Sequence, residues 1–480
     1  MTTLNNIQPY DFRTKLSYGV GSVAFGVKDA GFGSILLLFY NQALGLDARM
    51  AALAIAIALV VDAFIDPFIG YTSDHFRSRL GRRHPFMYAA AVPAALSYAF
   101  LFSPPLGLSQ TGLFGYLLVF AIIVRICIAL FEIPNSALIA EFTQNYDERT
   151  SYLTWRLFFG WVAGLSMSVA AFGVFLSHAK DGILGTQVPS NYQSYGIASA
   201  VIMLIGMLMS AFGTHHTIPR LRGPVNIEDN LDKKGFFKIL SLALLSRSAL
   251  MNLLVGFMLM LSTGLVAGIS PYLYSYLFAL TPNQISILYS AGFISAFVAL
   301  GFTPLLVKWF DKRQAYIGAT IASILIAPIA GLLQLNGLLP ASNSGLLIPF
   351  LFTIIVFASA FLIIQTTLYY SMSADIIEEN EVKTGHREEG IFFAANIFVR
   401  KCATGLGVLL TSMILAFAEF PEKATQLSIT NDLVNRLFQY FIISFLFLNL
   451  ATIVCVYAYK ITRARHIENL LFLADKHQKQ

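Results

Sequence analysis

Charged residues are scarce in this chain of 480 residues: Asp, Glu, Lys and Arg make up 12% of it, against 56% hydrophobic residues. Soluble domains carry about 25% charged residues, so the composition excludes an ordinary soluble protein. Cysteine is scarce as well, and Cys127, Cys402 and Cys455 lie in apolar segments without metal-ligand spacing. We expect these cysteines to be free thiols rather than disulfides or a metal site.

The sequence also lacks the common catalytic patterns. It contains no G-x-S-x-G, no H-E-x-x-H and no P-loop. No histidine lies in the middle of an apolar run, which argues against a histidine proton relay. The polar amino terminus and the long first apolar run argue against a cleavable signal peptide. We therefore expect neither an enzyme nor a bound cofactor; a membrane-embedded enzyme or a transporter-like sensor remains the alternative of another class.

Long apolar runs, in contrast, recur along the whole chain. The hydrocarbon core of a bilayer needs about 20 residues of helix, and twelve runs reach that length. Their expected spans are 16–45, 48–73, 85–105, 111–142, 149–178, 192–217, 247–280, 283–309, 313–336, 344–376, 388–419 and 433–463. The pattern predicts an all-α integral membrane protein with twelve transmembrane helices.

The longest polar stretch between the runs, Thr217 to Leu240, divides the twelve helices into six and six. We expect an N-terminal six-helix bundle over 1–217, a cytoplasmic linker over 218–246, a C-terminal six-helix bundle over 247–463 and a cytoplasmic tail over 464–480. A weak repeat supports two pseudo-symmetric bundles around a central cavity. An acidic residue and a basic pair follow the second and the eighth runs: Asp74 with Arg82 and Arg83, and Asp311 with Lys312 and Arg313.

Lys and Arg gather in the loops on the side of the two termini, which indicates that both termini are cytoplasmic. These loops explain the net charge of +6 without a nucleic-acid partner. The expected setting is the cell (inner) membrane, with multiple passes. The expected partners are the lipid bilayer, a small-molecule substrate and a coupling cation, and we expect the protein to function as a monomer.

Two acids, Asp62 and Asp66, stand one helical turn apart in the run AALAIAIALVVDAFIDPFIGY. In a helix their carboxylates share a face, roughly 6 Å apart along the axis. Ionisable groups inside a bilayer are costly, and two neighbouring carboxylates repel each other until a proton or metal ion relieves the repulsion. This pattern indicates a cation-coupled membrane transporter; the alternative is an acid pair at a solvated helix end.

Four separated blocks of sequence carry a resemblance to a known family. They are GVKDAGFG, DAFIDPFIGYTSDHFRSRLGRRHP, FEIPNSALIAEFTQNYDERTSY with WRLFFG, and ADIIEENEVKTGHREEG with FVRK. The layout of six and six helices resembles the major facilitator superfamily. The blocks, in this order, resemble the glycoside-pentoside-hexuronide:cation symporter family over nearly the whole chain.

The resemblance implies a coupling-cation site at Asp62 and Asp66, with help from Glu132. It implies a substrate site formed by Lys28, Asp29, Glu132, Arg156, Asn396 and Lys401. The chemistry of the residues agrees, because polar groups deep in apolar helices are unfavourable without a partner or a water-filled cavity. The structural alternative is a set of salt bridges that only holds the helices together.

Departures from the family pattern bear on the substrate. Family members that carry galactosides have a Trp one turn after the acid of the fourth helix, where this chain has Ser136. The chain adds Arg125 on the same helix face as Glu132, roughly 10.5 Å away along the axis. We count Arg125 among the substrate-binding candidates because a guanidinium grips a carboxylate through two parallel hydrogen bonds, which suits a hexuronate. Alternatively, Arg125 pairs with Asp29 or Glu132 or points to the outer headgroups.

The coupling ion is partly readable. Sodium at Asp62 and Asp66 is one possibility, but it needs several oxygen ligands, and the nearby Ile65 and Ala129 supply none from their side chains. A proton needs only one carboxylate with a raised pKa. The sequence therefore favours H⁺ over Na⁺.

A further set of charged residues is expected to form a conformational gate on the cytoplasmic side, holding one alternating-access state. These residues are Asp74, Arg77, Arg82, Arg83, Asp375 and Arg387. Some basic residues could instead serve only to anchor the topology. The prediction as a whole is cation-coupled symport, by alternating access, of a sugar, glycoside or hexuronate-like solute. The alternative within the family is a lysophospholipid or other amphipathic substrate.

Overall fold

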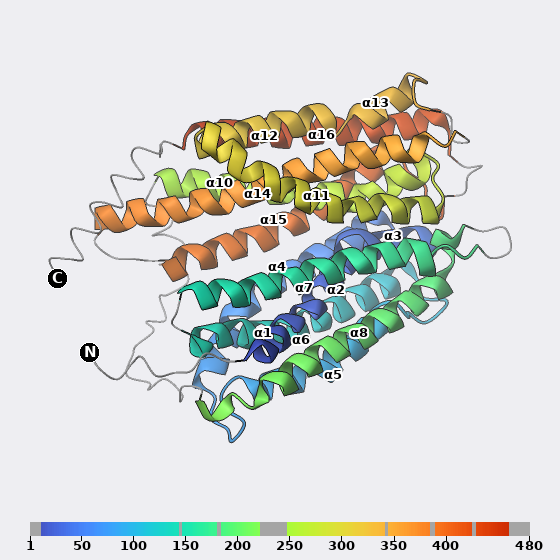
Figure 1. Ribbon diagram of the computed structural model, residues 1–480. Coiled ribbons are helices and arrows are strands. Elements are labelled where there is room, and N and C mark those ends of the chain that lie inside the picture. Colours follow the sequence, from blue (N-terminus) through green and yellow to red (C-terminus); the bar gives the residue numbers. More distant parts are fainter. Residues whose placement is uncertain are drawn as a thin grey trace. The chain divides into compact units, whose positions relative to one another are not determined.

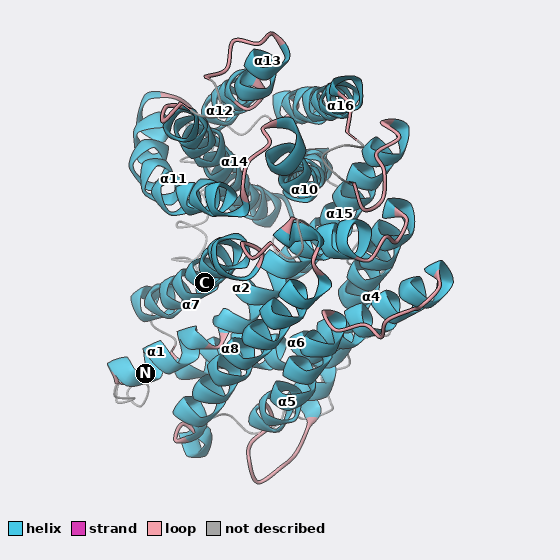
Figure 2. Ribbon diagram, turned by 90° about the vertical axis from the view of Figure 1, so that its right-hand side faces the viewer, coloured by secondary structure: helices cyan, strands magenta, loops and turns pink. Residues whose placement is uncertain are grey.

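The computed structural model describes residues 11–143, 146–179, 184–220, 247–340, 344–384, 389–424 and 429–459. Within these ranges the regular structure is helical, and Figure 2 shows no strand among the parts that it colours. The chain divides into two compact units, Met1–Asn230 and Leu231–Gln480. Most of the expected linker, residues 221–246, lies outside the described residues.

The first unit contains six membrane-length segments (Figure 1). The first segment is a chain of short helices: α1 (Phe12–Val20), α2 (Ser22–Ala30), η1 (Gly31–Ile35), α3 (Leu36–Leu38) and η2 (Phe39–Ala43). The others are α4 (Ala48–His75), α5 (His84–Leu101), α6 (Gln110–Phe142), α7 (Tyr146–Ala170) with η3 (Ala171–Phe175), and α8 (Pro189–His215), accompanied by the short η4 (Gly185–Gln187) and η5 (Ile218–Arg220).

The second unit also contains six segments. They are α10 (Arg247–Tyr272) with η6 (Leu273–Leu277), α11 (Pro282–Trp309), α12 (Lys312–Ile326) with α13 (Ile329–Leu335), α14 (Leu347–Thr384), α15 (Glu389–Phe417) and α16 (Asn431–Tyr457). Among the described residues, 11 helices are long and apolar enough to cross a membrane. The twelfth expected span corresponds to α5, whose 18 residues include two prolines. The prediction of a membrane protein built from apolar helices is confirmed.

Helices begin where side chains satisfy the first backbone N–H groups, which have no partner inside the helix. Asp47 accepts hydrogen bonds from the backbone N–H groups of Arg49 and Met50 at the start of α4. Thr281 and Gln284 form a capping box at the start of α11. These caps fix where the chain turns back into the membrane.

The two units repeat each other closely at this turn. Helix α11 begins and ends 234 residues after α4, and both contain 28 residues. The π-helix η6 lies 234 residues after the π-helix η2. The left-handed residues that follow keep the same spacing, with φ of 79° at Gly45 and 50° at Ala279. The predicted duplication is therefore visible in the backbone, on the side of the bundles opposite to the sequence echo.

Glycines allow close helix contacts in both units. A Cβ on Gly26 of α2 would lie 2.0 Å from the carbonyl oxygen of Gly160 in α7. A Cβ on Gly407 of α15 would lie 2.4 Å from the carbonyl oxygen of Leu261 in α10. Small residues let helix backbones approach in a membrane, where apolar burial alone does not drive association. The α2–α7 contact positions Lys28 and Asp29, which follow Gly26 by less than one turn.

Candidate transport site

Asp62 of α4 forms a buried ion pair with Arg125 of α6, the helix beside it (Figure 2). Arg125 Nη1 donates to Asp62 Oδ2 at 3.0 Å, and the side chains of Arg125 and Asp62 are 4% and 5% exposed. The guanidinium also lies 4.5 Å from the centre of the Phe32 ring, within cation–π distance. The predicted coupling acid thus has a cation of the protein as its partner.

Asp66 lies one turn further along α4 and is partly buried, with one carboxylate oxygen shielded from solvent. The two acids and Arg125 together carry one net negative charge when all three are ionised. Among the described residues no group of three or more His, Cys, Asp or Glu side chains could hold a metal ion. The arrangement can therefore take up one monovalent cation without exceeding neutrality.

Lys28 and Asp29 form a second ion pair, on α2. Lys28 Nζ lies 2.8 Å from Asp29 Oδ1; the Lys28 side chain is 5% exposed and the Asp29 side chain is 50% exposed. The Lys28 ammonium also lies 4.3 Å from the centre of the Phe25 ring. The lysine is held by the protein, while its acidic partner remains accessible.

Glu132 and Arg156 form a third pair, between α6 and α7. Arg156 Nη2 donates to Glu132 Oε1 at 3.0 Å, and both side chains are partly exposed, at 20% for Arg156 and 30% for Glu132. A half-exposed pair of this kind can exchange its internal partner for a ligand at lower cost than a fully buried one. This places the predicted substrate residues of the first unit on α2, α6 and α7.

The remaining predicted substrate residues belong to the second unit. Asn396 of α15 is buried and accepts a hydrogen bond from the Tyr369 hydroxyl of α14. Lys401 lies on the same helix, five residues further on, and is partly buried. Tyr369 was not foreseen from the sequence, because its place beside Asn396 depends on how α14 and α15 pack.

Comparison with known proteins follows from this geometry. The family model described as MFS/sugar transport protein matches residues 17–463. The chain belongs to this family. It is a multi-pass membrane symporter of the major facilitator superfamily, not an enzyme, and the resemblance seen in the sequence to glycoside-pentoside-hexuronide:cation symporters is confirmed.

Individual relatives of this symporter are distant. An uncharacterised symporter of Synechocystis is 24% identical over alignments covering 85% of this chain and 86% of the relative. A glucuronide carrier protein homologue of Escherichia coli is 22% identical, covering 87% of this chain and 86% of the relative. The inward-open xylose transporter of E. coli covers 97% of this chain and is itself covered over 100% of its length, with a TM-score of 0.64 at 15% identity. That structural likeness shows the fold alone.

The predicted gate residues of the symporter's first unit converge on an acid that the sequence analysis had given no role. Glu141, near the end of α6, accepts hydrogen bonds from Arg82 at 2.7 Å and from Arg83. Arg83 also lies 3.1 Å from Asp74. Arg77 is exposed. Glu141 follows Arg82 by 59 residues, so only the packing of α6 against the α4–α5 loop reveals the cluster.

The second unit holds a comparable cluster at the corresponding loop. Lys312 Nζ lies 2.7 Å from Asp375 Oδ1, and the Tyr459 hydroxyl donates to Asp375 Oδ2 at 3.0 Å. Burial and the negative charge of Asp375 raise the pKa of the Tyr459 hydroxyl well above its ordinary value, so the hydroxyl stays protonated and keeps donating. Arg387, the other predicted gate residue here, lies outside the described residues.

Proposed function

We propose that this symporter couples uptake of a sugar, glycoside or hexuronate-like solute to protons, with Asp62, Asp66 and Glu132 forming the coupling site. The observation that carries the proposal is the buried ion pair of Asp62 with Arg125. With Asp62 neutralised from within, the acid pair requires only one further positive charge. One proton on one carboxylate supplies it.

Sodium fits this arrangement less well than a proton. A hard metal cation requires several oxygen ligands, whereas Arg125 already occupies an oxygen of Asp62. A sodium ion about 4 Å from the guanidinium would be repelled by about 4 kcal/mol at an effective dielectric constant of 20. Ile65 and Ala129 supply no further side-chain oxygen. Proton coupling avoids both difficulties, because a proton needs no coordination shell.

The solute proposal rests on the two partly accessible pairs, Lys28 with Asp29 and Glu132 with Arg156. Carboxylates accept hydrogen bonds from sugar hydroxyls, and the guanidinium of Arg156 offers a planar fork to a solute carboxylate. The glucuronide carrier homologue is named for an acidic sugar, which supports including hexuronates. We assign Arg125 to Asp62 first, and contact with the solute only where a carboxylate reaches beyond Arg156.

The clusters around Glu141 and Asp375 are proposed as conformational gate elements on the cytoplasmic side, with both termini cytoplasmic. Each cluster fixes a loop to a helix within its own unit, so each unit can move as a rigid body during alternating access. Glu141 is the residue that anchors the first of these loops.

Counter-flow into proteoliposomes, with a panel of neutral sugars, glycosides, hexuronates and lysophospholipids, tests the solute class. We expect exchange of a sugar-like solute and none of lysophospholipid. Accumulation should follow an inward proton gradient and be unchanged when sodium is removed. Asp66→Asn should abolish accumulation while preserving exchange, because exchange moves no net cation. Accumulation that survives collapse of the pH gradient but requires sodium would refute proton coupling; exchange of lysophospholipid alone would refute the solute class.

A further inference from the structure

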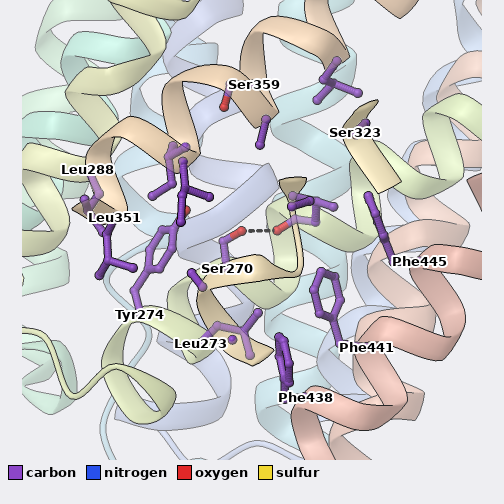
Figure 3. A pocket seen from close by; sticks show the side chains of 18 of the residues that line it. Ser270, Leu273, Tyr274, Leu288, Ser323, Leu351, Ser359, Phe438, Phe441 and Phe445 are labelled. Carbon is purple, nitrogen blue, oxygen red and sulfur yellow. Dashed lines mark hydrogen bonds between the residues drawn. The ribbon is translucent and has the colours of Figure 1, made fainter. Parts of the chain in front are cut away.

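The second unit contains a cavity of about 140 Å³ in the middle of its helices. It is lined by residues from α10 with η6, α11, α12, α13, α14 and α16. Figure 3 shows Leu288 and Leu351 on one side of it and Phe441 and Phe445 on the other. The cavity lies within one unit, and none of the predicted coupling, substrate or gate residues lines it.

The repeat between the two units explains why this space is open. With the spacing of 234 residues, Arg125 of α6 corresponds to Ser359 of α14, and both Glu141 and Asp375, which hold basic loops, fit the same spacing. Phe32, which lies under Arg125, corresponds to Val266. Two large side chains of the first unit are thus replaced by two small ones, and Ser359 and Val266 both line the cavity.

The charges of the first unit have no counterpart in the cavity. At the same spacing, Lys28 corresponds to Ser262 and Asp62 to Ala296. None of the described residues that line the cavity is charged. The site that binds a cation in one repeat has therefore become an apolar chamber in the other.

The few polar groups in the cavity wall are bonded within the protein. Asn449 Nδ2 donates to the Phe445 carbonyl at 2.8 Å and contacts Ser262 Oγ at 3.4 Å. Ser270 donates to the Val266 carbonyl at 2.5 Å. A buried water needs two to four polar partners, whereas an engineered apolar cavity of about 150 Å³ stays dry and binds benzene. The chamber therefore suits an apolar guest rather than water or a sugar.

We propose that this chamber binds the end of an unbranched alkyl chain, about six carbons long by comparison with the benzene-binding cavity. Phe438, Phe441 and Phe445 form one wall for such a chain, from successive turns of α16. The chain belongs either to a bilayer lipid or to an amphipathic solute; the chemistry recognised is the same in both cases. This binding is independent of the proton-coupled function proposed above.

Two photoreactive probes distinguish the sources: a phosphatidylcholine and an alkyl glucoside, each with a diazirine at the end of its chain. The full-length protein in lipid nanodiscs is irradiated with each probe, and labelled residues are mapped by mass spectrometry. Labelling of Phe441 and Phe445 is expected. Phe447, which is exposed on α16, serves as the reference for general contact with lipid. Labelling by the phosphatidylcholine identifies a bilayer lipid, and labelling by the glucoside alone identifies the tail of a solute.

Variants that fill the chamber provide the decisive comparison. Ser359→Leu and Val266→Phe should each lower labelling of Phe441 and Phe445 about tenfold, because each buried methylene displaced from the chamber is worth about 0.8 kcal/mol. Thr353→Leu, on an exposed position of α14, is the matched control and should leave the labelling unchanged. Labelling of Phe447 should be equal in all four proteins, which also reports correct folding. Unlabelled Phe441 and Phe445 in the wild type, or equal labelling in the filled variants, would overturn the proposal.

Discussion

Asp62 and Arg125 show how one residue beyond the family pattern changes the chemistry of a site. A charged side chain near the centre of a bilayer costs roughly 2.5 to 3.5 kcal/mol on insertion scales, so Arg125 requires a partner. The sequence left Asp29, Glu132 and the outer headgroups as candidates, and the structure shows Asp62 instead. A buried pair whose partners compensate each other becomes strongly destabilising when one partner is removed.

Removal of Arg125 alone should therefore cost stability. Arg125→Gln leaves Asp62 buried without its cation, and breaking such a pair costs about 3 to 5 kcal/mol. The double variant Arg125→Gln with Asp62→Asn should recover most of the loss, because both charges are then gone. Thermal unfolding of the purified single and double variants measures this. Equal losses from the single changes that simply add in the double variant would show that the two residues are not coupled.

Arg49→Gln is the matched control for this cycle. The Arg49 side chain is 68% exposed and pairs with Asp47 at 2.9 Å. Exposed ion pairs contribute about 0 to 1 kcal/mol. The control should therefore leave the melting temperature nearly unchanged, which separates burial of the charge from the loss of an arginine as such.

At the scale of helices, the contact between α2 and α7 holds the first substrate pair in place. Gly26→Ala would bring a Cβ within 2.0 Å of the Gly160 carbonyl oxygen, so the two backbones must separate. Overpacking costs typically about 1 to 3 kcal/mol, and we expect a lower melting temperature together with weaker solute binding at Lys28 and Asp29. Gly115→Ala, on α6 with no atom within 4 Å of the added Cβ, is the control. A drop of similar size in both variants would contradict the proposed helix contact.

The helices themselves could be predicted from the sequence, whereas the partners of their charged residues could not. A bilayer requires long apolar helices, so run lengths reveal the spans directly. Which carboxylate meets Arg125 depends on the rotation of α6 about its axis. Asp375 was expected to act with Arg387, a near neighbour in sequence, but the structure shows Lys312, 63 residues earlier in the chain. Such pairs depend on packing between helices that sequence spacing does not encode.

At the scale of the whole molecule, the two units share one backbone plan and differ in chemistry. The corresponding positions of the two repeats place Lys28, Asp62 and Arg125 in the first unit opposite Ser262, Ala296 and Ser359 in the second. The buried charges proposed for coupling therefore lie in the first unit, and the second offers an apolar chamber at the corresponding place. A weak repeat in sequence can thus hide a close repeat in structure, because only the backbone turns have been kept.

The number of protons taken up with each solute molecule tests proton coupling most directly. Solute entry and internal acidification are measured together in sodium-free proteoliposomes that contain a pH-sensitive dye. One net negative charge shared by Asp62, Asp66 and Arg125 predicts one proton per solute in the wild type. Asp66→Asn should show solute exchange with no acidification. Solute accumulation in sodium-containing vesicles without any acidification, accompanied by uptake of radioactive sodium, would contradict proton coupling.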